Sequence, residues 1–421
     1  MLKRALLTAV VALAVAAPNA LAHDDDDEVR FATFNASLNR NFEGELVQDL
    51  STPTDPQFRN VAEIIQRVRP DVLLLNELDF VAGGEALRLF QRNYLSVSQN
   101  GARPIRFEYS FVAPSNTGIP TGKDLNNNGQ IVTTPLAPGY GDDSYGFGEF
   151  PGKFGLGVLS RKPIDRRGVR TFQHFKWKDM PGNLIPQPFY SPDEVDILRL
   201  SSKSHWDVPI EVDRKRTVHF LVSHPTPPVF DGPEDRNGRR NFDEIRFWAD
   251  YIAPWRSRYI YDDRGKRGGL RHGESFVIAG DQNSDPLDGD SVPGAIQQLL
   301  DHPLVNDRSA PTSPGGPEQA ALQGGANATH RSDPAFDTAD FADGAPGNLR
   351  ADYVLPDADT RIKRSFVFWP RSTDPLFRLA GLFSAALLPD GNGFPASDHR
   401  LVAVDVELKR GGRGGKHHHD R

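Results

Sequence analysis

Polar side chains that could carry acid–base or metal chemistry recur where short apolar runs of the sequence end. Apolar runs of this length are typical of buried strands, and in α/β sheets the strand ends open into the crevice where ligands bind. One acid at a strand end is commonly a solvated turn residue. Acids, amides and imidazoles at six strand ends instead indicate one shared site. The residues are Asn35, Glu77, His224, Asp281, Asn283, Asp352, Asp398 and His399.

The sequence contains no cysteine. This absence excludes disulfides, thiolate zinc sites, iron–sulfur clusters and cysteine nucleophiles. Any metal must therefore be held by oxygen or imidazole, and carboxylate and amide oxygens suit a hard divalent cation.

The elements that must position these side chains alternate along the chain between strand-like and helix-like patterns. The 421 residues are 38% apolar and 25% charged, a globular composition, and the alternation predicts an α/β protein. Predicted strands cover 29–34, 71–78, 107–112, 155–159, 217–223, 275–279, 352–355, 365–369 and 401–408. Predicted helices cover 56–69, 84–94, 242–252 and 294–300, and long loops cover 114–153, 176–209 and 310–348.

The first 22 residues have the pattern of a secretory signal. Lys3 and Arg4 precede an apolar segment over 5–17, and Ala20-Leu21-Ala22 fits the cleavage rule. An uncleaved anchor is the alternative, but the apolar segment is short for a membrane span. We therefore expect cleavage near Ala22 and a secreted or periplasmic monomer without membrane insertion. One domain with loop insertions is expected over 23–408, followed by a flexible tail over 409–421.

Seven sequence blocks resemble those of the endonuclease/exonuclease/phosphatase superfamily. They occur in family order and span 31–408, nearly all of the chain that would remain after cleavage. The resemblance implies a four-layer αββα sandwich of two mostly antiparallel sheets with outer helices. It also implies hydrolysis of phosphate esters assisted by Mg²⁺ or Mn²⁺. The blocks are Phe34-Asn35-Ala36-Ser37, 70–77, 155–161, Val222-Ser223-His224, 280–284, 352–355 and Ser397-Asp398-His399.

The same resemblance assigns roles to the residues at the strand ends. Glu77 would be the principal metal ligand, with Asn35 and Asp398 in or near the coordination shell. Asp281 would orient or deprotonate the attacking water, and Asn283 would contact the phosphate.

Two histidines would complete the machinery. His399 would act as a base or as a protonated clamp on the phosphate, with its other ring nitrogen held by Asp352 from a neighbouring strand. His224 would protonate the leaving oxygen or stabilise the phosphate. A hydrogen-bonded histidine at a strand end is the alternative interpretation of His224.

Three further residues are candidates for substrate binding. Lys203 and His205 lie just before the strand that ends at His224, where relatives often place a basic phosphate contact. Arg240 could clamp a phosphate through two hydrogen bonds, or pair with Asp243 or Glu244 of its own helix.

A separate motif occupies 124–129 in the first long loop. Asp124, Asn126 and Asn128 alternate and are followed by Gly129, which reproduces the first half of a calcium-binding loop. The twelfth position is Pro135 rather than Glu, so the motif is not an EF-hand. A structural Ca²⁺ site and an Asn-rich turn are the two interpretations.

The sequence therefore predicts an exported, divalent-metal-dependent phosphoesterase, with phosphodiesters favoured over monoesters. The alternative is a secreted nuclease acting on DNA or RNA, which the formal net charge of −7 disfavours only weakly. A lipid substrate is less favoured because the sequence shows no aromatic hairpin or basic amphipathic helix. A catalytically silent binding module would not need so many acids and histidines at one site.

Overall fold

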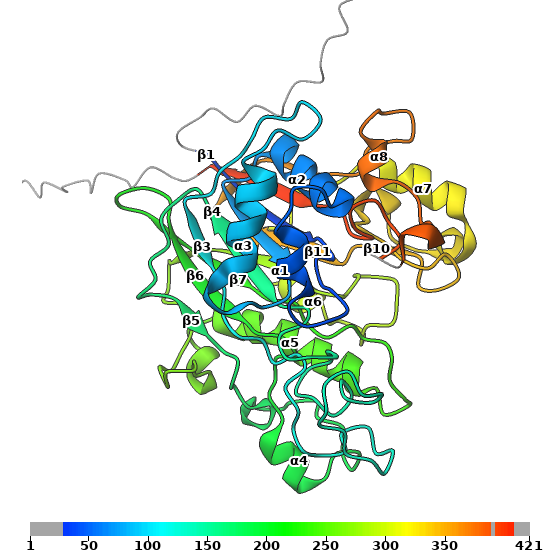
Figure 1. Ribbon diagram of the computed structural model, residues 1–421. Helices are drawn as coiled ribbons and strands as arrows, with labels where there is room; N and C mark the ends of the chain where they lie inside the picture. The colour runs from blue at the N-terminus through cyan, green and yellow to red at the C-terminus, as the bar shows by residue number, and fades with distance from the viewer. Residues whose placement is uncertain (1–27, 389–391, 408–421) are drawn as a thin grey trace, which may run out of the picture.

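The computed structural model describes residues 28–388 and 392–407 (Figure 1). The predicted signal segment 1–22 and the tail 409–421 lie outside the described residues. Within the described ranges, no helix combines the length and apolar character needed to cross a membrane.

The first sheet has six strands in the order β12-β13-β1-β2-β4-β3. β1 and β2 run parallel, and the other neighbouring pairs are antiparallel. The carboxyl ends of β1 and β2 therefore point to the same edge of the sheet. The strands are β1 (Glu28–Asn35), β2 (Val72–Asn76), β3 (Tyr109–Phe111), β4 (Leu156–Ser160), β12 (Arg361–Val367) and β13 (Val402–Glu407).

The second sheet has five strands in the order β11-β8-β7-β6-β5, of which only β7 and β8 are a parallel pair. A two-stranded ribbon, β9 (Ala339–Asp340) with β10 (Asn348–Leu349), forms a third, small sheet, and Ala339 is bridged to His399 just before β13. The strands of the second sheet are β5 (Arg170–Thr171), β6 (Trp206–Glu211), β7 (Thr217–Val222), β8 (Ser275–Asp281) and β11 (Asp352–Pro356).

The two sheets pack face to face because successive side chains of a strand point to opposite faces. In β2, Val72 and Leu74 face the second sheet, whereas Leu73 and Leu75 face the helices outside. Phe31 of β1 and Phe220 of β7 meet between the sheets, with ring centroids 5.5 Å apart. The central strands are buried on both faces, as expected of a four-layer sandwich, whereas the edge strands β12 and β3 are partly exposed.

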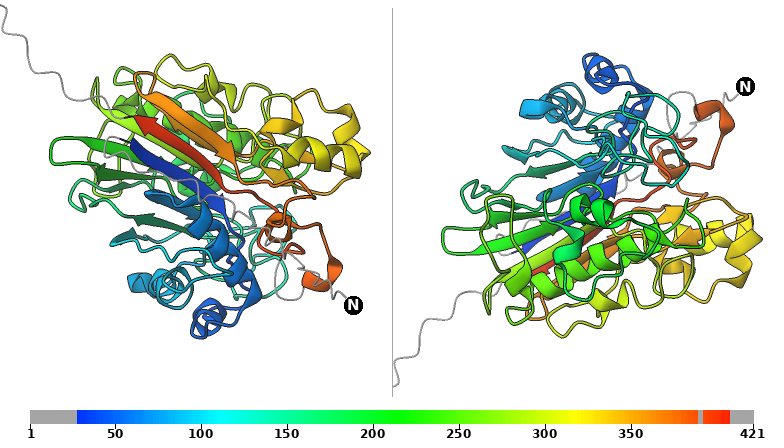
Figure 2. Two further views of the ribbon diagram at one scale, coloured as in Figure 1. Left: turned by 90° about the horizontal axis from the view of Figure 1, so that it is seen from above. Right: turned by 90° about the horizontal axis from the view of Figure 1, so that it is seen from below.

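Helices cover the outer face of each sheet (Figure 2). α2 carries Asp55 as its N-cap and Pro56 in its first turn, and its apolar side packs on the first sheet. α5 packs on the second sheet through Ile245 and Trp248. The α-helices are α1 (Glu45–Leu50), α2 (Pro56–Val68), α3 (Glu85–Phe90), α4 (Pro192–Ile197), α5 (Arg236–Tyr251), α6 (Gln297–Leu300), α7 (Gly315–Gln323) and α8 (Phe377–Ala380).

The predicted fold class, an αββα sandwich of two mostly antiparallel sheets, is confirmed. The predicted loop over 114–153 contains no helix or strand. The loops predicted over 176–209 and 310–348 are wrong in part, because the first contains α4 and the start of β6 and the second contains α7 and β9. Pro209 is tolerated in β6 because its backbone faces away from β7 and toward Asp165. The amide of Asp165 donates to the Pro209 carbonyl at 3.0 Å.

Candidate active site

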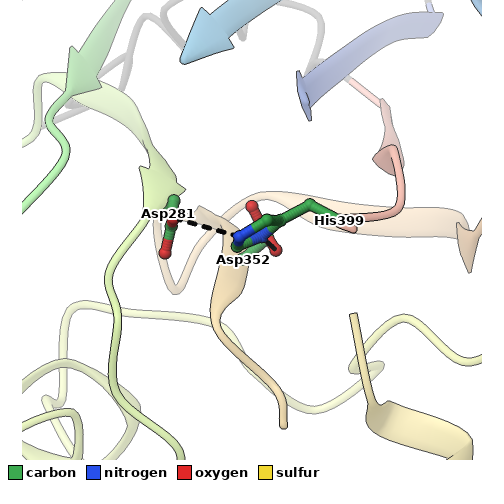
Figure 3. A group of neighbouring side chains, drawn as sticks. All are labelled: Asp281, Asp352 and His399. Atoms are coloured by element: carbon green, nitrogen blue, oxygen red, sulfur yellow. Dashed lines mark hydrogen bonds and ion pairs between the residues drawn. The ribbon is translucent and has the colours of Figure 1, made fainter. Parts of the chain in front are cut away.

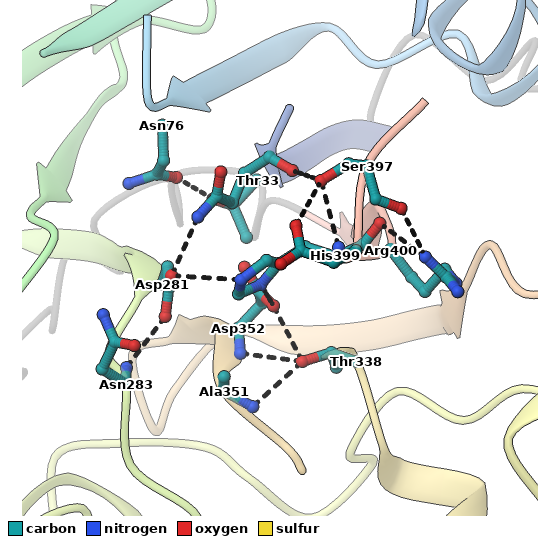
Figure 4. Close-up of polar contacts among 12 residues, drawn as sticks. Thr33, Asn76, Asp281, Asn283, Thr338, Ala351, Asp352, Ser397, His399 and Arg400 are labelled. Atoms are coloured by element: carbon teal, nitrogen blue, oxygen red, sulfur yellow. Dashed lines mark hydrogen bonds and ion pairs between the residues drawn. The ribbon is translucent and has the colours of Figure 1, made fainter. Parts of the chain in front are cut away.

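The predicted strand-end residues of the two sheets converge at one edge of the sandwich. Figure 4 shows Asp281, Asn283, Asp352 and His399 of this group. Nδ2 of Asn35, at the end of β1, lies 3.0 Å from Oε1 of Glu77 and 3.0 Å from Oδ2 of Asp281. Asp281 ends β8 in the second sheet. A single amide therefore joins two acids that come from different sheets.

Asp281 lies at the centre of this group and is buried. Its Oδ2 is 3.3 Å from Nε2 of His224 and 3.6 Å from Nε2 of His399, and its Oδ1 accepts a hydrogen bond of 2.9 Å from the amide of Asn283. Burial raises the pKa of Asp281 to about 7, and the nearby charge of Asp352 adds to this effect. A carboxyl group that titrates near neutral pH is suited to accept a proton from water.

The close approach of β7 and β8 at this edge depends on Gly280. A Cβ at this position would lie 2.0 Å from the carbonyl oxygen of Ser223, and the φ angle of +143° is one that other residues rarely adopt. Glycine therefore lets the last residues of both strands bring His224 and Asp281 together.

Asp352 and His399 form a buried hydrogen-bonded couple (Figure 3). Oδ2 of Asp352 lies 2.8 Å from Nδ1 of His399 and also accepts a 2.8 Å hydrogen bond from Oγ1 of Thr338. Burial lowers the pKa of His399, but the carboxylates of Asp352 and Asp281 outweigh burial and raise it well above its ordinary value. The couple therefore favours a protonated imidazole.

His224 has the opposite electrostatic environment. Burial and then the cationic charges of Lys203 and His399 hold the pKa of His224 well below its ordinary value. Its Nδ1 is buried and has no hydrogen-bond partner among the described residues. His224 is therefore a neutral imidazole whose Nε2 can donate to Asp281 and whose Nδ1 remains available.

Glu77 and Asp398 present carboxylate oxygens beside Asn35. Burial raises the pKa of Glu77, and the negative charge of Asp398 raises it further. Oδ1 of Asp398 accepts from the hydroxyls of Ser37 at 3.2 Å and Ser397 at 3.3 Å. In the described part of the chain, no hydrogen bond reaches Oε2 of Glu77 or Oδ2 of Asp398. These free oxygens fit a hard divalent cation.

A second group of potential metal ligands adjoins the first. One ligand atom each of Asp281, Asp352 and His399 lies within 4.8 Å of the others. Nδ1 of His399 already pairs with Asp352, so a cation here would compete with that hydrogen bond. In the all-oxygen set of Glu77, Asn35 and Asp398, the described residues give Oε2 of Glu77 and Oδ2 of Asp398 no hydrogen bond, whereas Oδ1 of Asn35 accepts from the amide of Ser37 at 3.3 Å. We assign the cation to this set in the proposal below.

The three predicted substrate-binding residues have different positions. Lys203 is buried, and its ammonium makes no hydrogen bond within the described chain. Burial lowers the pKa of Lys203, while the charges of Glu244, Glu77 and Asp281 oppose this effect. Lys203 therefore lies near the acids of the site as a cation without a fixed partner.

His205 does not join the site. The neighbouring side chain of Trp206 faces the other sheet, so the ring of His205 points to the outer helix layer. Its ring centroid lies 4.9 Å from that of Phe247 and 5.1 Å from that of Trp248. Both ring nitrogens are used, with Ser201 Oγ and the Glu244 carbonyl each 3.0 Å away. The predicted substrate contact of His205 is not supported by this geometry.

Arg240 binds the main chain of surrounding loops. Its guanidinium donates to the carbonyls of Leu200, Tyr145 and Arg199 at 2.8, 2.6 and 2.8 Å. Neither predicted role, a phosphate clamp or an ion pair with Asp243 or Glu244, corresponds to these contacts.

The calcium-loop motif folds into a turn whose side-chain oxygens accept backbone hydrogen bonds. Asp124 accepts from the amides of Asn128 at 3.0 Å and Gly129 at 2.7 Å, and Asn126 accepts from the amide of Asn128 at 3.1 Å. Oδ1 of Asn128 accepts from the amide of Gln130 at 2.8 Å. This is the hydrogen bonding of an Asn-rich turn, and the Ca²⁺ site stays a prediction.

Several residues that hold the site were not singled out from the sequence. Ser37 and Ser397 bind Asp398. Each lies in the same sequence block as a predicted site residue, and this proximity in the chain is the signal that could have identified them. Thr338 lies in a predicted loop and binds Asp352 only through the tertiary fold. Phe341 packs edge-on against the ring of His399, with centroids 5.3 Å apart.

A model of the Endonuclease/Exonuclease/phosphatase family matches residues 32–399. A search of curated proteins finds no match. The matched span contains all eight strand-end residues of the site.

Similar solved structures include an endonuclease/exonuclease/phosphatase from Beutenbergia cavernae DSM 12333, with 17% identity over 90% of this chain and 72% of that chain and a TM-score of 0.47. Sphingomyelinase C from Streptomyces griseocarneus has 16% identity over 90% of this chain and 99% of that chain, with a TM-score of 0.44. TDP2 from C. elegans has 12% identity over 90% of this chain and 75% of that chain, with a TM-score of 0.43.

Proposed function

The chain belongs to the endonuclease/exonuclease/phosphatase family, and we propose that it is a divalent-metal-dependent phosphoesterase that prefers phosphodiesters. One observation carries the proposal: Oδ2 of Asp281 is shared by Asn35, His224 and His399, while Asn35 also binds Glu77. A base, two imidazoles and a set of metal ligands therefore meet at one point.

Asp281 is the proposed general base. With its pKa near 7 in the metal-free protein, a substantial fraction is ionised at neutral pH and can accept a proton from water. The amide of Asn283 fixes Oδ1 and leaves Oδ2 toward the two histidines. The position of the acceptor oxygen is thus set before substrate arrives.

His399 and His224 have separate proposed roles. His399 is protonated and held by Asp352, so it can donate from Nε2 to a phosphate oxygen or to the leaving group. His224 is neutral and contributes a hydrogen bond rather than a charge. Two imidazoles in different protonation states allow one to give a proton while the other orients.

Two cations are proposed to compensate the charge of the phosphate. Glu77, Asn35 and Asp398 would hold the cation, which supplies charge neutralisation and polarisation of the phosphate when bound. Lys203 is the proposed second cation, since the charges of Glu77 and Asp281 act on its ammonium and the described residues give it no hydrogen bond. Asn283 is the proposed polar contact to phosphate, although its Nδ2 is bound to the Pro225 carbonyl at 3.1 Å without substrate.

Turnover of bis(p-nitrophenyl) phosphate tests the proposal. The protein should hydrolyse this diester with added Mg²⁺ or Mn²⁺, lose the activity with EDTA and regain it when the cation is restored. p-Nitrophenyl phosphate, DNA, RNA and phospholipid, assayed in parallel, distinguish a diesterase from a phosphatase, a nuclease and a lipid hydrolase.

The matched control for Glu77→Gln is Glu407→Gln. Glu407 lies at the far end of β13, away from the site, and the same chemical change there should leave turnover unaffected. Glu77→Gln should reduce turnover by orders of magnitude. Equal turnover by the two variants at limiting Mg²⁺ would refute the assignment of Glu77.

We also propose export to the periplasm or the medium with cleavage near Ala22, on the signal-like pattern of 1–22. Mass spectrometry of the exported protein should show a chain that begins at His23. A chain that retains Met1 would contradict this proposal.

A further inference from the structure

One face of α5 is hydrogen-bonded to three segments that carry the proposed catalytic residues. Asn241, Glu244 and Trp248 are spaced three and four residues apart, so they share this face, and all three are buried. Their side chains bind Ser202, Ser223, Thr226 and Gln282, which are neighbours in the chain of Lys203, His224 and Asp281. None of these contacts reaches a catalytic side chain directly.

Glu244 joins two segments through one carboxylate. Oε1 accepts from the amide of Ser202 at 2.7 Å and from its hydroxyl at 3.1 Å, and Oε2 accepts from the amide of Thr226 at 2.6 Å. Both amides lie outside the ladder between β6 and β7, which begins at Trp206 and ends at Val222. A buried carboxylate is stable only when its oxygens are paired, and here the pairing fixes the main chain beside Lys203 and beyond His224.

Asn241 joins the second segment to a third. Its Nδ2 donates to the carbonyls of Thr226 and Gln282, each at 2.9 Å. Gln282 lies between Asp281 and Asn283 in the chain. Trp248 adds a hydrogen bond of 2.9 Å from Nε1 to the hydroxyl of Ser223, the residue before His224.

We propose that Asn241 and Glu244 are positioning residues for the reaction, because they fix the main chain that carries Lys203, His224 and Asp281 to one rigid helix. This inference rests on the proposed phosphoesterase function and adds to it. A displacement of about 1 Å at reacting groups can reduce turnover about 100-fold, so loss of these hydrogen bonds should affect the rate more than substrate binding.

Glu244→Gln is the principal test. Glutamine keeps the shape but has one acceptor oxygen, so its NH₂ group must face either the Ser202 or the Thr226 amide. We expect kcat to fall about 10- to 100-fold, with a much smaller change in KM. Asn241→Ser removes the amide donor to the carbonyls of Thr226 and Gln282 and should also lower kcat. It replaces Glu244→Gln as the test if that variant does not fold.

Asp243→Asn is the matched control. Asp243 is the next residue of α5, is equally buried, and accepts from Trp177 Nε1 at 2.7 Å and from the Leu184 amide at 2.6 Å. That segment carries none of the proposed catalytic residues. Both hydrogen bonds are accepted by Oδ2, so the amide oxygen of asparagine can keep them, and the substitution removes only a buried charge on the same turn of α5. Asp243→Asn should therefore leave kcat close to that of the wild type.

A double-mutant cycle with His224→Ala decides whether Glu244 acts through the His224 segment. Glu244→Gln should cost much less in the His224→Ala background than in the wild type. The inference is overturned if Glu244→Gln reduces kcat no more than Asp243→Asn, or if the cycle is additive. A wild type without EDTA-sensitive diesterase activity would refute the proposed function itself and the inference with it, so the two failures are distinguishable.

Discussion

Nδ1 of His399 lies 2.8 Å from Oδ2 of Asp352, and the two residues belong to different sheets. His399 precedes β13 of the first sheet, whereas Asp352 begins β11 of the second. The sequence-based expectation that they lie on neighbouring strands is therefore wrong, because β11 pairs with β8 and faces β13 across the sandwich. The couple thus depends on correct packing of the two sheets.

Asp352→Asn should impair turnover less than His399→Ala. Asparagine keeps the shape and a hydrogen bond but removes the charge that raises the pKa of His399, so this pKa should fall. Because both residues act as one unit, the double variant should resemble His399→Ala alone. Values of kcat/KM and an NMR titration of the His399 ring measure the two effects. A double variant whose loss equals the product of the single losses would show that the residues act independently.

Glu77→Gln should weaken Mn²⁺ binding by at least about 10-fold, since even residues that only support metal ligands contribute that much. Asp352→Asn should weaken it far less, because Asp352 is occupied by His399 and Thr338. Isothermal titration with Mn²⁺ measures both affinities without substrate. The reverse order would place the cation on Asp281, Asp352 and His399 instead.

The sequence predicted the strand ends well because the apolar runs before them are short and continuous. Val72 to Leu75 is buried on both faces, and so the run marks β2 without ambiguity. The start of β6 lies in the predicted loop 176–209, because this segment is rich in Gly, Pro, Asn, Asp and Ser. Only the pairing of its neighbours shows that the backbone of Pro209 faces away from β7. Local pattern thus located the strands whose two faces are both apolar.

The positions of side chains around the site were less accessible from sequence. Lys203 and His205 are two residues apart, yet Lys203 lies among the acids and His205 packs in the helix layer. Which of two neighbouring polar residues faces a site depends on where the strand begins, and β6 begins only at Trp206. The role of Thr338 depends on contacts made across the tertiary fold and leaves no local signal.

Ca²⁺ should raise the melting temperature if Asp124, Asn126 and Asn128 bind it, by linkage between binding and folding. The experiment uses the Glu77→Gln background, so that binding at the active site contributes little. Asp124→Asn in this background should remove the stabilisation by Ca²⁺. Asparagine has one acceptor oxygen and loses one of the two amide hydrogen bonds of Asp124, so the shift caused by Ca²⁺ is compared within each variant. A melting temperature that is indifferent to Ca²⁺ and EGTA would identify an ordinary Asn-rich turn.

Asp337→Asn should stabilise the protein at alkaline pH. Asp337 is buried, its Oδ1 has no hydrogen-bond partner among the described residues, and burial together with Asp285 and Asp288 raises its pKa to about 8. In the unfolded chain this pKa is about 3.9, so between pH 4 and 8 the folded state keeps a proton that the unfolded state loses. The contribution of Asp337 to the free energy of unfolding is therefore complete below pH 4 and is lost as the pH rises through 8.

Urea unfolding should show similar free energies of unfolding for wild type and variant at pH 4, and a higher value for the variant at pH 9. Asp333→Asn, an exposed N-cap on the same segment, is the control and should show no such gain. Equal pH dependence of all three proteins would show that Asp337 is ionised and stabilised in the fold by some other group.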